Sequence, residues 1–171
     1  HKLYGPTGIG VLYGKRELLD TMPPYMGGGD MVDKVTFAKT TYAPLPLKFE
    51  AGTSNFIGAI GLAEAIKFVQ SLPKEEVEQH EKELLDYATE QLSQIEGLHI
   101  YGTTAGKAPI ISFNVEGCDH YDIGMILDKM GVAVRTGHHC AEPTMNRFGT
   151  NGVVRASIAL YNNKEDIDAL V

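Results

Sequence analysis

The stretch PIISFNVEGCDHYDIGMILDKMGVAVRTGHHC, residues 109–140, decides the fold class. Its beginning, 109–115, is rich in β-branched and aromatic side chains and predicts a strand. Residues 119–130 predict a helix, and 131–135 (GVAVR) predict another strand. A helix of ordinary length between two such strands is typical of a small α/β or α+β layer.

Further elements are expected on both sides of this stretch. Residues 98–101 and 152–160 predict strands, and a helix begins at about 164. Upstream, Ser54 and Asn55 can cap a helix that runs to about Gln70. The three- and four-residue spacing in this helix predicts one buried face, made of Phe56, Ile57, Ile60, Ala63, Ile66 and Val69. A second helix over about 74–96 ends before Gly97 and would bury Val77, Leu84, Leu85, Ala88, Leu92 and Ile95.

The amino-terminal part is less regular. Residues 8–14 (GIGVLYG) predict a short strand or hairpin arm, whereas 22–48 are rich in proline and glycine. So much irregular backbone indicates a functional segment, or a surface that contacts a part of a longer protein outside these 171 residues. We place a domain boundary within the long helices and expect two domains, 1–70 and 71–171.

Composition narrows the class of protein. The chain has 171 residues, 43% of them hydrophobic and 22% charged, as in ordinary globular domains. Neither a membrane span nor a signal peptide is visible, and a first residue of His suggests a fragment of a longer chain. Acidic residues outnumber basic ones, 22 to 15, which argues against nucleic-acid and membrane partners. Two cysteines without a CxxC spacing predict a reducing, cytoplasmic compartment.

The segment RTGHHCAEP, residues 135–143, carries the first chemical signal. Only His138 and Cys140 of the three adjacent candidates could share a metal ion, and no further ligands have the necessary spacing. A buried structural cysteine would be expected inside an apolar element, whereas Cys140 lies on a loop. A reactive thiol is the third interpretation, because Arg135 and a protonated His138 or His139 would favour the thiolate.

Three other stretches carry weaker signals. Lys2 leads directly into a glycine-rich turn, so it is either a frayed end or an amine that can form a Schiff base. Gly52 and Thr53 precede a helix and represent either plain capping or a phosphate site. Arg155 lies within an apolar strand and requires a carboxylate partner, from the chain itself or from a substrate.

Taken together, HKLYGPTGIG, FEAGTSN, RTGHHCAEP and RASIALYN resemble the carboxy-terminal half of a group II cysteine desulfurase. These SUF-type desulfurases and selenocysteine lyases belong to the class V aminotransferase family, with the α/β fold type I of pyridoxal phosphate (PLP) enzymes. The resemblance covers essentially the whole chain and is most specific at RxGHHCA. It implies that 1–70 end a large PLP-binding domain and that 71–171 form the small carboxy-terminal domain.

The resemblance also implies a role for each matching residue. Lys2 would bind PLP with His1 beside it, and Cys140 would be the nucleophile that carries persulfide. Arg155 would hold the substrate carboxylate, and Arg135 and His139 would lie beside the cysteine loop. Gly52 and Thr53 would reach the PLP phosphate of the other subunit, which implies a homodimer.

The chemistry implied is the conversion of L-cysteine, or L-selenocysteine, to L-alanine, with the sulfur passed to an acceptor protein for iron–sulfur cluster assembly. Glu142 departs from the uncharged residue of many relatives and would disfavour the thiolate slightly. The family's ring-stacking histidine and pyridine-binding aspartate match no position in this chain, so we expect the chain alone to be inactive.

Two other functions fit the same sequence. Another class V aminotransferase or a kynureninase-like lyase would need no thiol. A non-catalytic module that binds a sulfur acceptor or scaffold protein would need no cofactor.

Overall fold

The computed structural model describes residues 1–171, which form two compact units, His1–Leu72 and Pro73–Val171. Each unit is described by itself. The boundary expected from sequence, between residues 70 and 71, falls in the last turn of the helix that ends the first unit. No single helix is long and apolar enough to cross a membrane, and only two consecutive helices taken together reach that length and composition.

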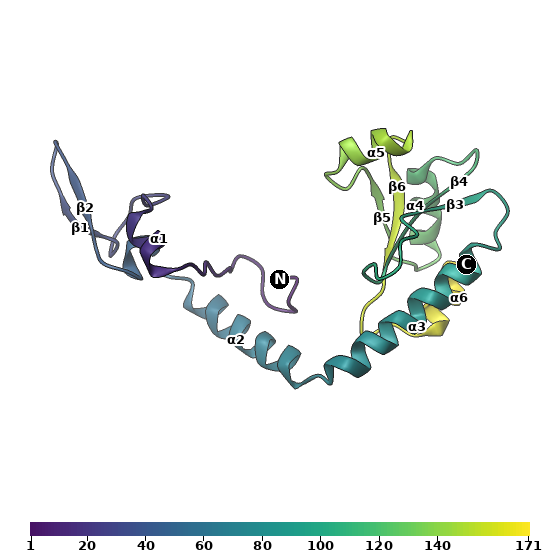
Figure 1. Cartoon of the computed structure of the whole chain (residues 1–171), viewed down its shortest axis with the longest axis horizontal. Coiled ribbons are helices and arrows are strands. Elements are labelled where there is room, and N and C mark those ends of the chain that lie inside the picture. Colours follow the sequence, from purple (N-terminus) through teal and green to yellow (C-terminus); the bar gives the residue numbers. More distant parts are fainter. The chain divides into compact units, whose positions relative to one another are not determined.

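The second unit is a four-stranded sheet with helices (Figure 1). In chain order its elements are α3 (Lys74–Leu92), β3 (Leu98–Tyr101), β4 (Ile110–Val115), α4 (His120–Lys129), β5 (Arg135–Gly137), α5 (Glu142–Phe148), β6 (Val153–Ser157) and α6 (Lys164–Leu170). The strand order is β3-β4-β6-β5 and every pairing is antiparallel. The α/β class expected from the alternation of strands and helices is therefore confirmed.

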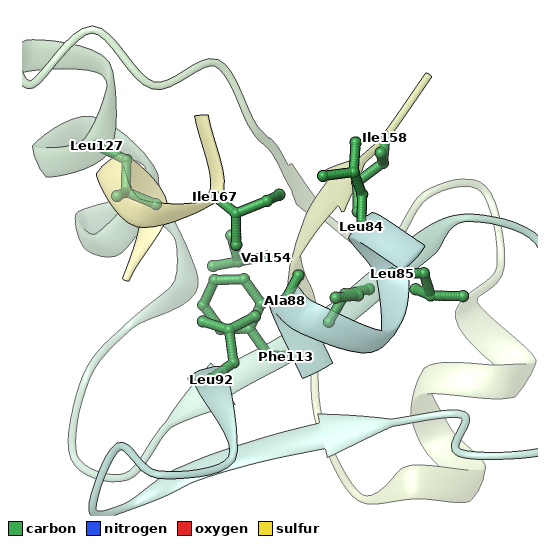
Figure 2. Close-up of a cluster of buried hydrophobic side chains, with 10 residues drawn as sticks. Leu84, Leu85, Ala88, Leu92, Phe113, Leu127, Val154, Ile158 and Ile167 are labelled. Carbon is green, nitrogen blue, oxygen red and sulfur yellow. The ribbon is translucent and has the colours of Figure 1, made fainter. Parts of the chain in front are cut away.

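One face of this sheet makes the hydrophobic core. Because side chains alternate along a strand, Ile111, Phe113 and Val154 share a face, and all three are buried. They pack with apolar side chains of α3, α4 and α6, labelled in Figure 2: Leu84, Leu85, Ala88, Leu92, Leu127 and Ile167. Of the face predicted to be buried on α3, Leu84, Leu85, Ala88 and Leu92 are buried, whereas Val77 and Ile95 are half-buried and Ile95 lies beyond the end of the helix. Each of the larger side chains, Ala88 excepted, contributes about 1.5–3 kcal/mol when fully buried.

The opposite face of the sheet is mainly polar, although Val153 of β6 is buried there. Residues displaced by one position along the strands point there, including Ser112 and Asn114 on β4 and Arg155 on β6. Helix α5 lies on this side, since the ring of Phe148 packs against Tyr101 of β3 with centroids 5.3 Å apart. The polar face is the one that carries the candidate site.

The first unit buries much less. It contains α1 (Arg16–Thr21), a hairpin of β1 (Val32–Val35) and β2 (Thr40–Tyr42), the 3-10 helix η1 (Leu47–Phe49) and α2 (Phe56–Ser71). Met31, next to the hairpin, is its largest fully buried side chain. Asn55 caps α2, as predicted, by accepting a hydrogen bond from the Gly58 amide at 2.9 Å.

The amino-terminal segment lies along α2 and runs against its direction. The ring of Tyr4 packs edge-on against Phe68, Gly5 lies against Leu62, and Asn55 Nδ2 donates to the Gly8 carbonyl at 3.2 Å. The segment therefore passes from the carboxyl end of α2 to its amino end.

Three expectations from sequence are wrong. Residues 8–14 form no strand: their backbone pairs with no other segment, and Val11, Leu12 and Tyr13 are exposed. The face predicted to be buried on α2 is exposed at Phe56, Ile57 and Ile60, whereas Gly58, Leu62 and Ala65 are buried. Nearly every position of this helix is apolar or small, so periodicity cannot select a face.

The third difference concerns the strand expected at 131–135. Gly131 has a positive φ of 86°, and the Val132 amide donates to the Leu127 carbonyl, which completes the end of α4. Strand β5 therefore begins only at Arg135. The short helix α5, which follows the cysteine directly, was not predicted.

Candidate functional site

Cys140 lies on a tight turn between β5 and α5. After Gly137 the chain enters His138, and both His139 (φ 54°) and Cys140 (φ 56°) adopt left-handed backbone conformations. The Cys140 amide donates to His138 Nδ1 at 3.1 Å, and the Ala141 amide donates to the His138 carbonyl at 2.9 Å. Cys140 is exposed and free, so its thiol is accessible.

His139 attaches this turn to the neighbouring strand. Its Nε2 donates to the Val153 carbonyl of β6 at 3.2 Å, because a carbonyl oxygen can only accept. Burial lowers the pKa of His139 below its ordinary value, and the positive charges of Arg155 and Arg135 lower it further, although the bond to Val153 opposes them. The imidazole is therefore neutral near pH 7.

His139, one of the two imidazoles that would favour the thiolate when protonated, is therefore mainly uncharged near pH 7 in this geometry. His139 is neutral, and His138 accepts a hydrogen bond at Nδ1, which requires an unprotonated nitrogen there. The positive charge beside the turn comes from arginine.

Arg135 and Arg155 are directly opposite each other on β5 and β6. Like charges at such a position repel, and neither guanidinium forms an ion pair in residues 1–171. The Nε of Arg155 is buried without a hydrogen-bond partner. An internal carboxylate, one of the two partners that sequence left open for Arg155, is absent, so the pair is suited to an external anion.

Residues that sequence analysis missed hold β6 in place. Asn114 Nδ2 donates to the Gly152 carbonyl at 2.9 Å and to Thr150 Oγ1 at 3.2 Å. Thr150 Oγ1 donates to the same carbonyl at 2.7 Å. The only available signal was an asparagine inside an otherwise apolar strand, which requires buried partners.

His120, the first residue of α4, also supports the start of β6. It is 5% exposed, and its Nδ1 lies 3.2 Å from Asp119 Oδ1. Its ring packs directly on Gly152, and the Gly137 backbone also lies close to Gly152. The start of α4 therefore supports both strands that flank the cysteine turn.

The remaining candidates lie in the first unit, at opposite ends of α2. His1 and Lys2 are exposed and precede Tyr4, which contacts Phe68 near the carboxyl end of the helix. Gly52 (φ 70°) and the exposed Thr53 precede its amino end. About 18 Å of helix, from Phe56 to Phe68, separates the amino end of α2 from the point where Tyr4 contacts it.

The structure thus brings Arg135, His139, Cys140 and Arg155 together within 73–171. His1 and Lys2 lie in the same unit as Gly52 and Thr53 but not beside them. No group of three or more His, Cys, Asp or Glu side chains in residues 1–171 is placed to hold a metal ion.

Comparisons with known proteins agree with one another. The sequence profile of the family "Aminotransferase class-V" matches residues 1–170. A "probable cysteine desulfurase" of Staphylococcus epidermidis is 52% identical over 172 residues, which cover 100% of this chain and 42% of that protein. The chain therefore spans less than half the length of this relative.

Solved structures show the same fold. A crystal structure of the Escherichia coli cysteine desulfurase CsdA, in an S-sulfonic acid form, superposes with a TM-score of 0.91 at 41% identity. The superposed region covers 99% of this chain and 42% of the CsdA chain. A C-DES mutant with glycine covalently linked to its PLP cofactor gives a TM-score of 0.76 at 25% identity, over 98% of this chain and 42% of the other.

Proposed function

Because the chain belongs to the class V aminotransferase family, we propose that it is the cysteine-bearing part of a PLP-dependent cysteine desulfurase. The substrate is L-cysteine, the product is L-alanine, and the sulfur is carried as a persulfide on Cys140. The relatives named as cysteine desulfurases support this assignment over other members of the family.

The observation that carries the proposal is the arrangement around the cysteine turn. An exposed free thiol projects from a fixed turn beside two arginines that lack carboxylate partners. Arg155 is half-buried, and its planar fork matches the carboxylate of an amino acid. A site that binds a carboxylate beside a nucleophilic thiol suits an amino-acid substrate that carries sulfur.

The chain's residues divide the reaction as follows. When bound, PLP supplies an electron sink that labilises the substrate Cα proton and its Cβ–S bond. The Cys140 thiolate forms a new S–S bond with the substrate sulfur, while the Cβ–S bond breaks and its electron pair remains on carbon. Lys2 Nζ carries protons to and from the substrate carbon atoms. The products are alanine and Cys140 persulfide.

The residues of the first unit fit PLP chemically. Lys2 provides an exposed primary amine for the aldehyde, and Thr53 provides an exposed hydroxyl for the phosphate. The Tyr4 contact that precedes α2's last turn and the amino end of the helix are about 18 Å apart, which disfavours binding of one PLP by both residues of one chain. We therefore infer that Gly52 and Thr53 serve the site of a second copy, as in a homodimer with shared sites.

The RTGHHCA motif at 135–141 assigns the chain to the SUF-type desulfurases within this proposal. An acceptor protein then takes the sulfur for iron–sulfur cluster assembly, and L-selenocysteine is a second substrate. Two free cysteines are consistent with a cytoplasmic location. Since the chain spans less than half of its relatives, we expect no turnover from these 171 residues alone.

Peptide mapping tests the proposal. The chain is joined to the amino-terminal segment of the Staphylococcus relative, incubated with PLP and L-cysteine, alkylated, and analysed by mass spectrometry. We expect an alkylated persulfide on Cys140 and none on Cys118, with no alanine from Cys140→Ser. Alanine formation at an unchanged rate by Cys140→Ser would instead indicate another class V chemistry. The unjoined chain is the control and should release neither alanine nor sulfide.

A further inference from the structure

The backbone of the cysteine turn is strained. Residues 1–171 contain four non-glycine residues with positive φ, and two of them, His139 and Cys140, are consecutive. Side chains disfavour this region because Cβ crowds the carbonyl oxygen, so non-glycine residues occupy it only where other interactions require it. Some interaction must therefore hold Cys140 in this conformation.

His138 supplies that interaction. Its carbonyl accepts from the Ala141 amide at 2.9 Å, and its side chain accepts from the Cys140 amide at 3.1 Å. The side chain thus bonds to the backbone two residues ahead, in the way that asparagine holds tight turns. His138 is exposed, so core packing does not fix its position.

The two histidines of the turn differ in what they bind. His139 uses Nε2 to reach the Val153 carbonyl on another strand, which fixes where the turn lies. His138 bonds only within the turn, to the nucleophile's own amide. A nitrogen that accepts a hydrogen bond carries no proton, so this geometry places the ring proton of His138 on Nε2.

We propose that His138 is a positioning residue: its unprotonated Nδ1 holds the Cys140 amide and so sets the strained backbone from which the thiol is presented. The importance of this geometry for catalysis rests on the proposed role of Cys140 as the nucleophile. The geometry itself can be tested without cofactor or substrate.

The test uses the ¹⁵N-labelled 171-residue chain and two variants. His138→Asn keeps a side-chain acceptor for the amide two residues ahead, whereas His138→Leu has a similar size but no acceptor. Nuclear magnetic resonance reports the proton position on the His138 ring and the hydrogen-exchange rate of the Cys140 amide. The Cys118 amide, which donates to the Val115 carbonyl at 3.1 Å, is the control for overall stability.

We expect a His138 ring with an unprotonated Nδ1 and a proton on Nε2. We also expect Cys140 amide exchange about fivefold faster in His138→Leu, with exchange near the wild-type rate in His138→Asn and unchanged exchange at Cys118. A proton on Nδ1, equal Cys140 exchange in all three proteins, or acceleration in both variants would overturn the proposal. None of these results bears on persulfide formation, so the desulfurase assignment stands or falls separately.

Discussion

At the scale of single residues, His139 couples the cysteine turn to pH. Its pKa in the folded chain lies below the ordinary value of 6.5, mainly because of burial. As the pH falls below 6.5, the unfolded chain therefore takes up a proton before the folded chain does. The contribution of His139 to the free energy of unfolding is thus largest above pH 6.5, declines as the pH falls through the folded pKa, and levels off below it.

The variant His139→Gln isolates this effect, because glutamine keeps a neutral N–H donor for the Val153 carbonyl but does not titrate. Urea unfolding of both proteins from pH 8 to pH 5 measures the difference in stability. We expect the wild type to lose stability relative to the variant as the pH falls, and the arginines beside the ring make the loss sensitive to salt. A difference in stability between the two proteins that stays constant from pH 8 to pH 5 would contradict a lowered pKa of His139.

Gly152 is required for close packing. A Cβ at this position would overlap the His120 ring and lie 3.0 Å from the Gly137 backbone carbon. His120 is 5% exposed and cannot move away freely. We expect Gly152→Ala to lower the free energy of unfolding by about 1–3 kcal/mol in urea titrations.

Two controls define the cause of this loss. A Cβ added at Gly27 meets nothing within 4 Å, so Gly27→Ala should change stability by less than about 0.5 kcal/mol. In a double-mutant cycle, Gly152→Ala should cost less when His120 is already alanine. Additive effects of the two substitutions would show that the ring is not the obstacle.

At the scale of elements, Asn55 joins α2 to the amino-terminal segment. Its Oδ1 accepts from Gly58 and its Nδ2 donates to the Gly8 carbonyl. Asn55→Ala removes both bonds and should cost about 1 kcal/mol. Asn55→Asp keeps the cap but loses the donor, so it should release only the segment.

Hydrogen exchange and limited proteolysis separate these two roles. We expect faster exchange at the start of α2 in Asn55→Ala alone, and faster cleavage within residues 1–10 in both variants. Equal protection of residues 1–10 in Asn55→Asp and wild type would mean that the bond to Gly8 does not hold the segment.

The elements also show what sequence patterns can predict. In α3, charged and apolar residues alternate at helical spacing, so the buried face of Leu84, Leu85, Ala88 and Leu92 was predictable. In α2 the buried face is determined by the amino-terminal segment, whose Gly5 and Pro6 pack against Gly61, Leu62 and Ala65. That contact joins distant parts of the chain, and no local period encodes it.

In the candidate site, too, local features were predictable from sequence, whereas contacts between distant parts of the chain were not. The location of Cys140 on a loop followed from local sequence, whereas the carboxylate partner expected for Arg155 stays a prediction, since the chain supplies none. The lowered pKa of His139 and the acceptor role of His138 Nδ1 did not, because they depend on burial, on a carbonyl of another strand and on the backbone of the turn. The support from Asn114 and His120 likewise depends on how β4, β6 and α4 meet.

At the scale of the whole molecule, the two units differ in how much apolar surface they bury. Residues 73–171 have a continuous core of apolar side chains, whereas the first unit fully buries few large ones. Val11, Tyr13, Ile57 and Ile60 of the first unit are 64% to 91% exposed. Exposed apolar side chains in such number are typical of surfaces that are covered by another protein or by more chain.

The chain by itself should therefore self-associate through the first unit. We expect sedimentation velocity to show species that grow with concentration, and Ile57→Glu with Ile60→Glu to shift them toward monomer, because charge opposes burial of that face. The matched control is Met125→Glu with Ile126→Glu on α4, whose side chains are each 59% exposed in the second unit. If both pairs of substitutions shift the chain toward monomer equally, the surface that mediates self-association does not lie specifically on α2. A monomer at every concentration would show that exposure of α2 is tolerated, and would remove the physical argument for a partner on that face.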